Sequence, residues 1–385
     1  MAENHKEKKR IPELDIMRGI GIILIAVFHI VFRSMNGIPD KVICSLGWGF
    51  VGTFFVLSGY TCRIHADVLD SYKRRIVGLI LPVLVIELVL LTLGGLYCMA
   101  VHGYTFRDVI HDVIITFLRP EVTTRINGTW GGGGILFTNL SPVWFVWSMV
   151  WTELFFHPLK RLIFGKKERV WVCFVIALFL IQNPMYVLLK PAPWGLTILP
   201  TYLLFMMIGL KLRERNAEEY LNRLSVPVAA AVTVLGLLFH FGLFLFNGNE
   251  SYYRSEYGNR GLLDVYTVVL QVLVFVPAMY LLARAVKGIP LLSKGLQWMG
   301  RHSLMVLLTH CIIAVVYCDI LHNYIRPGAY WYPELKGISL TGEIVGKSII
   351  TCILSLITCI PLCMLWDRVS VIRFKRSKKS HSPGD

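Results

Sequence analysis

The sequence is poor in charged side chains. Only 16% of its 385 residues are Asp, Glu, Lys or Arg, whereas 55% are hydrophobic. A soluble globular chain carries about 25% charged residues, so this chain lacks the polar surface that it would need in water. It also lacks any polar block long enough to be a separate soluble domain. These absences exclude a multidomain soluble protein and predict one domain embedded in a membrane.

Several local signatures are missing as well. The nine cysteines form no CxxC pair, and no His, Cys, Asp or Glu grouping has metal-ligand spacing. Neither a GxSxG nor a P-loop pattern is present. The cysteines lie mostly in or beside apolar runs, so we expect buried free thiols. We expect no bound metal or cofactor, and the first apolar run, which no small-residue cleavage site follows, is predicted to be a retained helix.

What the sequence does contain is a series of apolar runs long enough to cross a bilayer. They predict an all-α, polytopic membrane helix bundle of about ten transmembrane helices. The predicted spans are 16–33, 47–63, 76–100, 142–159, 170–189, 196–212, 225–246, 262–286, 298–321 and 345–368. Residues 1–370 are assigned to this single domain and residues 371–385 to a basic cytoplasmic tail. Helical spacing of apolar residues predicts an amphipathic surface helix over 106–118.

The net charge of +15 could indicate a nucleic-acid partner, but its distribution argues against one. Basic residues cluster at the ends of apolar runs and mark alternate connections. The clusters are Lys6 to Arg10, Lys73 to Arg75, Lys160 to Arg169, Lys211 to Arg215 and Arg373 to Lys379. By the positive-inside rule these connections and both termini are cytoplasmic. We therefore predict a multi-pass protein of the inner (plasma) membrane, in contact with lipids and not with nucleic acid.

Ionisable residues inside predicted spans are costly in hydrocarbon and are candidates for function. Arg18 and His29 lie on the first predicted helix, eleven positions apart. Three helical turns separate them, so both face the same way, about 16 Å apart along the axis. A guanidinium can hold phosphate, and a neutral imidazole can take a proton from a hydroxyl. The alternative is a packing histidine, bonded to a neighbouring helix.

Other candidates are weaker by themselves. Glu87, Glu153 and His310 lie within the third, fourth and ninth predicted spans, where each could be a structural partner or a functional group. Lys73, Arg74 and Arg75 precede the third span. They are explained either as positive-inside anchors or as a cytoplasmic site for phosphate groups, shared with Arg18.

Five segments together resemble the membrane acyltransferase-3 family, which includes bacterial carbohydrate O-acetyltransferases. They occur in the expected order over about residues 13–310. The first is ELDIMRG from Glu13, with Arg18 followed by His29. The others are GFVGTFFVLSGY from Gly49, YKRRI from Tyr72 with Leu81 and Pro82, PVWF from Pro142, and MGRHSL from Met299 with His310. Many family members carry two arginines three positions apart before the proline of the third helix; here Gly78 follows Arg75 at that spacing.

The resemblance implies about ten membrane helices with a cytoplasmic N-terminus. It also implies that His29 is the catalytic base or acyl relay and that Arg18 is needed beside it. We accordingly expect an integral membrane O-acyltransferase that uses cytoplasmic acyl-CoA, with acetyl-CoA as the expected donor. Its acceptor would be a hydroxyl of an extracytoplasmic glycan or lipid-linked sugar. Lys73, Arg74, Arg75 and Arg18 would bind the donor, while Ser58, Glu87, Glu153 and His310 would support the site.

Three alternatives stay open at this point. A transporter or polysaccharide-export helper on the same scaffold could use Arg18, Glu87 and His310 as a polar pathway. Ser58, in its Ser-Gly pair, is also explained as a helix-end turn. The aromatic residues of the predicted outer loops, Tyr252, Tyr253, Tyr257, Tyr330, Trp331 and Tyr332, could stack on sugars or belong to the interfacial aromatic belt.

Overall fold

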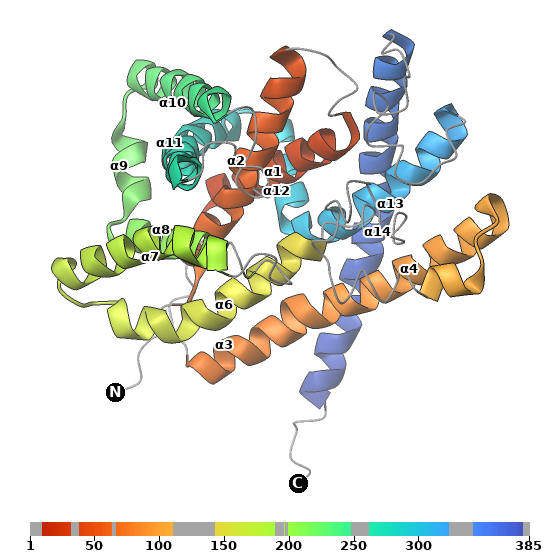
Figure 1. The fold of residues 1–385 in the computed structure, drawn as a ribbon, viewed down its shortest axis with the longest axis horizontal. Coiled ribbons are helices and arrows are strands. Elements are labelled where there is room, and N and C mark those ends of the chain that lie inside the picture. Colours follow the sequence, from red (N-terminus) through yellow and green to blue (C-terminus); the bar gives the residue numbers. More distant parts are fainter. Residues whose placement is uncertain are drawn as a thin grey trace.

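The fold is built from helices alone over the part of the chain that the structure describes (Figure 1). The computed structural model describes residues 10–31, 38–63, 67–110, 143–188, 196, 199–247, 262–322 and 342–379. No strand occurs in these ranges, so the all-α prediction is confirmed for them. The six aromatic residues of the predicted outer loops lie outside the described residues.

Each of the ten predicted spans overlaps a long helix. In chain order the main helices are α1 Pro12–Val31, α2 Ile38–Thr61, α4 Leu81–His102, α6 Val143–Ile163, α7 Glu168–Leu188, α8 Leu199–Glu214, α10 Val226–Phe246, α11 Leu262–Lys287, α13 Ser303–His322 and α14 Gly342–Lys379. Shorter helices are α3 Val68–Arg75, α9 Ala217–Arg223 and α12 Pro290–Arg301. α3 continues into α4 through a π-helical turn, Ile76–Ile80.

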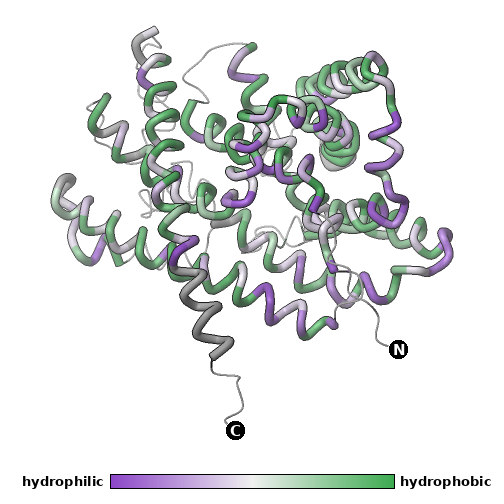
Figure 2. Tube along the Cα trace, turned by 180° about the vertical axis from the view of Figure 1, so that it is seen from behind, coloured by the Kyte–Doolittle hydropathy of each residue, from purple (hydrophilic) through white to green (hydrophobic). Residues whose placement is uncertain are grey.

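Six helical segments of the described chain are long and apolar enough to cross a membrane. They are Pro12–Val31, Ile38–Thr61, Val68–Tyr97, Val226–Phe246, Tyr266–Lys287 and Val345–Arg368. Large apolar side chains such as Leu88, Leu235 and Ile357 are exposed on the outside of these segments, as expected for a lipid-facing surface. Figure 2 shows that hydrophobic residues predominate along the helices. The count of about ten spans and the orientation stay predictions.

α1 is the centre of the bundle, in contact with α2, α11, α12, α13 and α14. Two glycines allow its close approach to α12. A Cβ on Gly19 would collide with the carbonyl group of Leu296, and one on Gly300 would collide with that of Asp15. Small residues at such crossings let helix backbones meet directly. α1 is therefore held against α12, the helix that leads into α13.

α2 and α8 pack against each other in the same manner. A Cβ on Gly59 would collide with the Met206 carbonyl, and one on Gly209 with the Val56 carbonyl. Beside this crossing the rings of Phe55 and Tyr202 stack with centroids 3.9 Å apart. Both side chains are fully buried. Backbone contact and aromatic packing together fix α2 relative to α8.

Local boundaries differ from the sequence prediction at several points. The ninth predicted span, 298–321, is divided at His302, where the amphipathic helix α12 ends and α13 begins. Of the surface helix predicted over 106–118, only 106–110 is described, and it is helical. α14 continues to Lys379, so the predicted tail from residue 371 begins as helix; its separation from the membrane domain stays a prediction.

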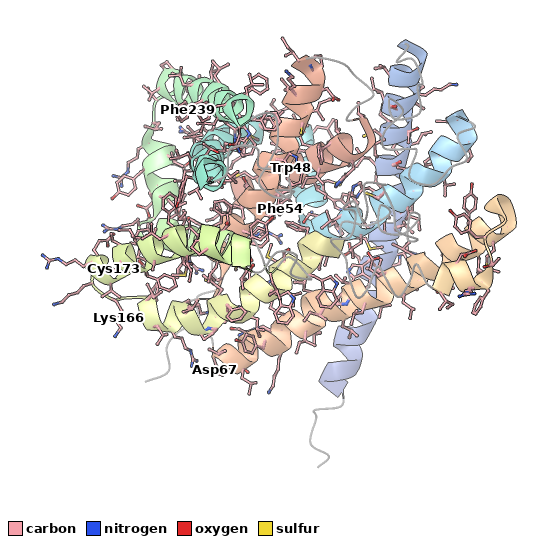
Figure 3. The ribbon with its side chains drawn as sticks, viewed as in Figure 1. Trp48, Phe54, Asp67, Lys166, Cys173 and Phe239 are labelled. Carbon is pink, nitrogen blue, oxygen red and sulfur yellow. The ribbon has the colours of Figure 1, made fainter. Side chains whose placement is uncertain are left out.

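The prediction of free thiols is confirmed for the described cysteines. Seven are free, and six of these are buried: Cys44, Cys62, Cys311, Cys352, Cys359 and Cys363. Cys173, on α7, is exposed (Figure 3). The expectation that the cysteines are buried is therefore wrong for that one position.

Candidate functional site

The two candidate residues of α1 lie at different depths of the same helix. Arg18 is in the second turn, and His29 is three turns later, about 16 Å along the axis. The Arg18 side chain is 25% exposed, and His29 is half-buried. The structure brings different partners to the two positions, so they form two separate groups of polar residues.

His29 meets His310 across the interface between α1 and α13. Nδ1 of His29 lies 3.0 Å from Nε2 of His310. The other nitrogen of His310, Nδ1, lies 2.8 Å from the carbonyl oxygen of Val306, one turn earlier in α13. His310 is completely buried. The two imidazoles are thus in direct contact, an arrangement that fits both sequence alternatives, packing and function.

The Val306 carbonyl determines the hydrogen-bonding roles of the pair. A carbonyl oxygen only accepts, so Nδ1 of His310 carries the proton and donates it to Val306. In a neutral ring the lone pair of His310 is then on Nε2, which accepts from Nδ1–H of His29. That bond places the lone pair of neutral His29 on Nε2. The chain of contacts therefore defines which nitrogen of His29 can act as a base.

Two further buried groups lie next to this pair. The Sγ atom of Cys311 is 3.1 Å from Nε2 of His310. Glu87, on α4, is 1% exposed and is close enough to Cys311 to interact with it electrostatically. Of the predicted supporting residues, His310 on α13 therefore contacts His29 directly, and Glu87 on α4 lies near Cys311, the neighbour of His310.

The second group joins α2, the end of α3 and α6. Arg75 binds the carboxylate of Glu153 with both ends of its guanidinium, Nε to Oε2 at 2.8 Å and Nη2 to Oε1 at 2.6 Å. The hydroxyl of Ser58 donates to Oε1 of Glu153 at 2.6 Å. Nε2 of His157 is 3.0 Å from Oε2, an ion-pair distance without the alignment of a hydrogen bond. The Glu153 side chain is 3% exposed, whereas that of Arg75 is 40% exposed.

Arg18 belongs to the same end of the bundle as this second group. Its Nη2 donates to the hydroxyl of Thr61 at 3.1 Å, and its Nη1 lies 3.6 Å from the carboxylate of Asp15. Arg18 and Arg75 are near enough for their charges to repel each other. Two guanidinium groups held close together are a favourable site for a polyanion.

The remaining predicted donor-binding residues are placed differently. Lys73 and Arg74 lie on α3 before Arg75 and are exposed. Of the three basic residues, only Arg75 is part of the polar network with Ser58 and Glu153. α3 therefore divides its basic residues between an outward surface and the interior of the bundle.

The connection between α2 and α3 is held by basic residues from two other helices. They are Lys160, which donates to the Arg63 carbonyl, Arg213, which donates to the Cys62 carbonyl, and Arg161, which pairs with Asp67. The hydrogen bond from Arg161 lowers the pKa of the exposed Asp67 carboxyl below its usual value. Asp67 also accepts from the Leu69 amide at the start of α3 (Figure 3). These contacts fix the position of α3 and hence of Arg75.

Sequence reasoning missed several members of the two groups. Thr61 and His157 gave no signal beyond their places near helix ends, and the charge of Lys160 was counted only as part of a basic cluster. Cys311 follows His310 directly, which is a signal only once His310 is known to contact His29. Asp15 lies inside the motif around Arg18, three positions before it, and could have been recognised as its ion-pair partner.

The bundle and its buried polar groups define a helical membrane protein with a histidine pair in its interior and an arginine-rich group toward one end. A family described as an acyltransferase domain matches residues 11–364, nearly the whole chain. The chain therefore belongs to the acyltransferase-3 family, and membership indicates a multi-pass membrane acyltransferase. Comparison of this chain with the curated proteins found no match, and comparison with the solved structures found none either.

Proposed function

We propose that this protein is an integral membrane O-acyltransferase of the inner (plasma) membrane. It takes an acyl group, with acetyl as the favoured one, from cytoplasmic acyl-CoA and transfers it to a hydroxyl of an extracytoplasmic glycan or lipid-linked sugar. The proposal keeps about ten spans with both termini in the cytoplasm. The excess of Lys and Arg on alternate connections supports this orientation.

The contact between His29 and His310 is the observation that carries the proposal. General base catalysis needs a neutral imidazole with its lone pair on a defined nitrogen and its ring held in place. The 3.0 Å contact to His310, itself anchored at 2.8 Å to the Val306 carbonyl, meets both needs. If His29 served only for packing, its partner His310 would not need to be oriented by the Val306 carbonyl.

The arginine group supports a polyanionic donor. Acyl-CoA has several phosphate groups that must stay near water while its thioester reaches inward. Arg18 and Arg75 lie together at the predicted cytoplasmic end, and the exposed Lys73 and Arg74 add positive charge on α3. The thioester, at the end of the long pantetheine arm, would then approach His29 about 16 Å deeper along α1.

The proposed reaction is direct acyl transfer. Nε2 of His29 takes the proton of the acceptor hydroxyl as the oxygen attacks the thioester carbonyl carbon. A C–O bond forms, the C–S bond breaks, and the proton passes from His29 to the departing thiolate, which leaves as CoA thiol. His310 does not touch the reacting atoms; it is a positioning residue that holds the lone pair of His29 on Nε2.

Thioester consumption by the purified protein tests this proposal. The protein in a membrane mimic is given acetyl-CoA and a panel of glycan acceptors, and release of CoA thiol is followed. Wild type is compared with His29→Ala and with His240→Gln. The control removes another buried imidazole, from α10, whose nitrogens face the carbonyls of Ser45 and Gln271 and not the candidate site.

Acceptor-dependent thiol release that is lost in His29→Ala and kept in His240→Gln is the expected result. Full activity of a folded His29→Ala protein would contradict the catalytic role of this residue. Movement of a glycan across the membrane without any use of acetyl-CoA would instead favour the transporter alternative, in which Arg18, Glu87 and His310 line a polar pathway.

A further inference from the structure

Three atoms that can ligate a metal meet at the interface of α1 and α13. They are Nδ1 of His29, Nε2 of His310 and Sγ of Cys311, and all lie within 4.8 Å of one another. Two of the separations are 3.0 Å and 3.1 Å. The residues come from positions far apart in the chain, which is why the sequence, read by local spacing, predicted no metal site.

The chemistry of this set favours one class of ion. Two imidazole nitrogens and one thiolate match the nitrogen and sulfur ligands of zinc, and three protein ligands are typical of zinc sites that keep a fourth position open. Hard ions such as Mg²⁺ prefer oxygen ligands. Tetrahedral zinc with the usual bond lengths holds such ligand atoms about 3.3–3.6 Å apart. The two shorter separations would open by a few tenths of an ångström, and the third, at most 4.8 Å, would have to settle at the same spacing.

The surroundings of the ligands also fit a metal. His310 and Cys311 are buried on α13, and the second nitrogen of His310 is anchored to the Val306 carbonyl at 2.8 Å. Such an outer hydrogen bond orients the ring and directs the Nε2 lone pair toward an ion. The ion would take the place of the proton on Nδ1 of His29, which now donates to Nε2 of His310.

We propose that His29, His310 and Cys311 form a binding site for Zn²⁺ and that zinc bound there inhibits acyl transfer. The inhibitory part rests on the proposed function, whereas the binding part does not. Binding releases the Cys311 thiol proton to solvent and leaves a zinc–thiolate bond. It also places the His29 lone pair at Nδ1 on the metal and moves the ring proton to Nε2.

Inhibition follows from this change of tautomer. Without metal, Nδ1–H of His29 donates to His310 and the lone pair on Nε2 can accept a proton. With zinc on Nδ1, the neutral ring carries its proton on Nε2 and cannot take another from the acceptor hydroxyl. Zinc thus converts the ring nitrogen that would act as base into a donor, without any change of fold.

Zinc binding is tested first, with no substrate present. Purified full-length protein in a membrane mimic competes for Zn²⁺ with a coloured zinc chelator, with Mg²⁺ as the hard-ion control. Wild type is compared with Cys311→Ser, with His310→Gln and with Cys173→Ser, which changes an exposed thiol on α7 (Figure 3). Co²⁺ in place of zinc adds a sulfur-to-cobalt charge-transfer absorption that reports thiolate ligation directly.

We expect wild type to bind one zinc ion per chain. The affinity for zinc should be unchanged in Cys173→Ser and more than about 10-fold weaker in Cys311→Ser and His310→Gln. The cobalt absorption should vanish in Cys311→Ser. Absence of saturable zinc binding to wild type, or equal binding to wild type and Cys311→Ser, overturns the proposal. Elution of each variant from a size-exclusion column as one monodisperse species, at the same volume as wild type, shows that it is folded.

The inhibitory part is tested by thioester consumption at increasing Zn²⁺. Wild type and Cys173→Ser should lose activity over the range in which zinc binds, and a chelator should restore it. Measured against its own activity without metal, Cys311→Ser should need more than about 10-fold more zinc than wild type for the same fractional loss. Zinc binding with undiminished transfer would refute inhibition alone, and binding by a protein with no transferase activity would refute the proposed function and leave the zinc site standing.

Discussion

Nδ1 of His29 and Nε2 of His310 lie 3.0 Å apart, although 281 positions separate the two residues in the chain. Close helix packing makes this contact possible. Gly19 and Gly300 bring α1 directly against α12, and α13 begins immediately after α12, at Ser303. His310 lies two turns into α13, at the level of His29 on α1. Close packing at these two glycines therefore helps to place His310 at the level of His29.

Substitution of His310 should impair the chemical step more than donor binding. In His310→Ala the His29 ring loses the acceptor that holds its proton on Nδ1, so the productive tautomer is no longer favoured. We expect kcat to fall about 10²-fold with little change in KM for acyl-CoA. Steady-state thioester consumption over a range of donor concentrations measures both.

His310→Gln is the second variant for this prediction, because its side-chain oxygen can accept from Nδ1–H of His29. It should recover part of the lost kcat. A parallel rise in KM with unchanged kcat in His310→Ala would place His310 in donor binding and would contradict its positioning role.

Arg75 and Glu153 should depend on each other for stability. Arg75 binds both oxygens of a carboxylate whose side chain is only 3% exposed. Arg75→Gln leaves that charge with fewer partners and should lower the free energy of unfolding by about 1–3 kcal/mol. The double variant Arg75→Gln, Glu153→Gln removes the stranded charge and should recover most of the loss.

Thermal unfolding of wild type, Arg75→Gln, Glu153→Gln and the double variant in the same membrane mimic measures this coupling. Arg223→Gln is the control, because Arg223 lies on α9 with a side chain that is 76% exposed, and it should change little. Additive effects of the two single substitutions would show that the Arg75–Glu153 contact does not stabilise the protein.

Features of the fold that depend on neighbouring residues in the chain were predictable from the sequence, whereas features that depend on contacts between distant residues were not. Apolar runs report the helices directly, and each predicted span overlaps a long helix. The division of the ninth predicted span at His302 was not predicted, because Arg301, His302 and Ser303 lie near the start of a run that is mostly apolar from there to residue 321. The division goes with contacts to distant parts of the chain: the amphipathic α12 packs along α1 through Gly300, and His302 lies 2.8 Å from Asp367 of α14.

The site shows the same limit. Arg18 and His29 share one helix, so their common face follows from helical geometry. The contacts of His29 with His310, and of Arg75 with Ser58 and Glu153, depend on which helices become neighbours. Hydropathy contains no information on that choice, because every lipid-facing helix has a similar apolar composition.

Helix crossings through glycine should be sensitive to a single methyl group. A Cβ on Gly59 would collide with the Met206 carbonyl group of α8, and a backbone atom cannot move aside as a flexible side chain can. Gly59→Ala should therefore lower the thermal unfolding midpoint and the yield of folded protein. Gly242→Ala is the matched control, because a Cβ there has no neighbouring atom within 4 Å; equal midpoints for the two variants would contradict the crossing.

The proposed orientation predicts which connections reagents can reach from each side. Lys166, in the turn between α6 and α7 (Figure 3), belongs to a basic connection assigned to the cytoplasm. In a variant with exposed Cys173 changed to Ser, Lys166→Cys should react with a membrane-impermeant maleimide only after the cells are permeabilised. Lys336→Cys, in the predicted outer connection after α13, should react in intact cells. Labelling of Lys166→Cys in intact cells would reverse the assigned orientation, and the arginine group would then face away from cytoplasmic acyl-CoA.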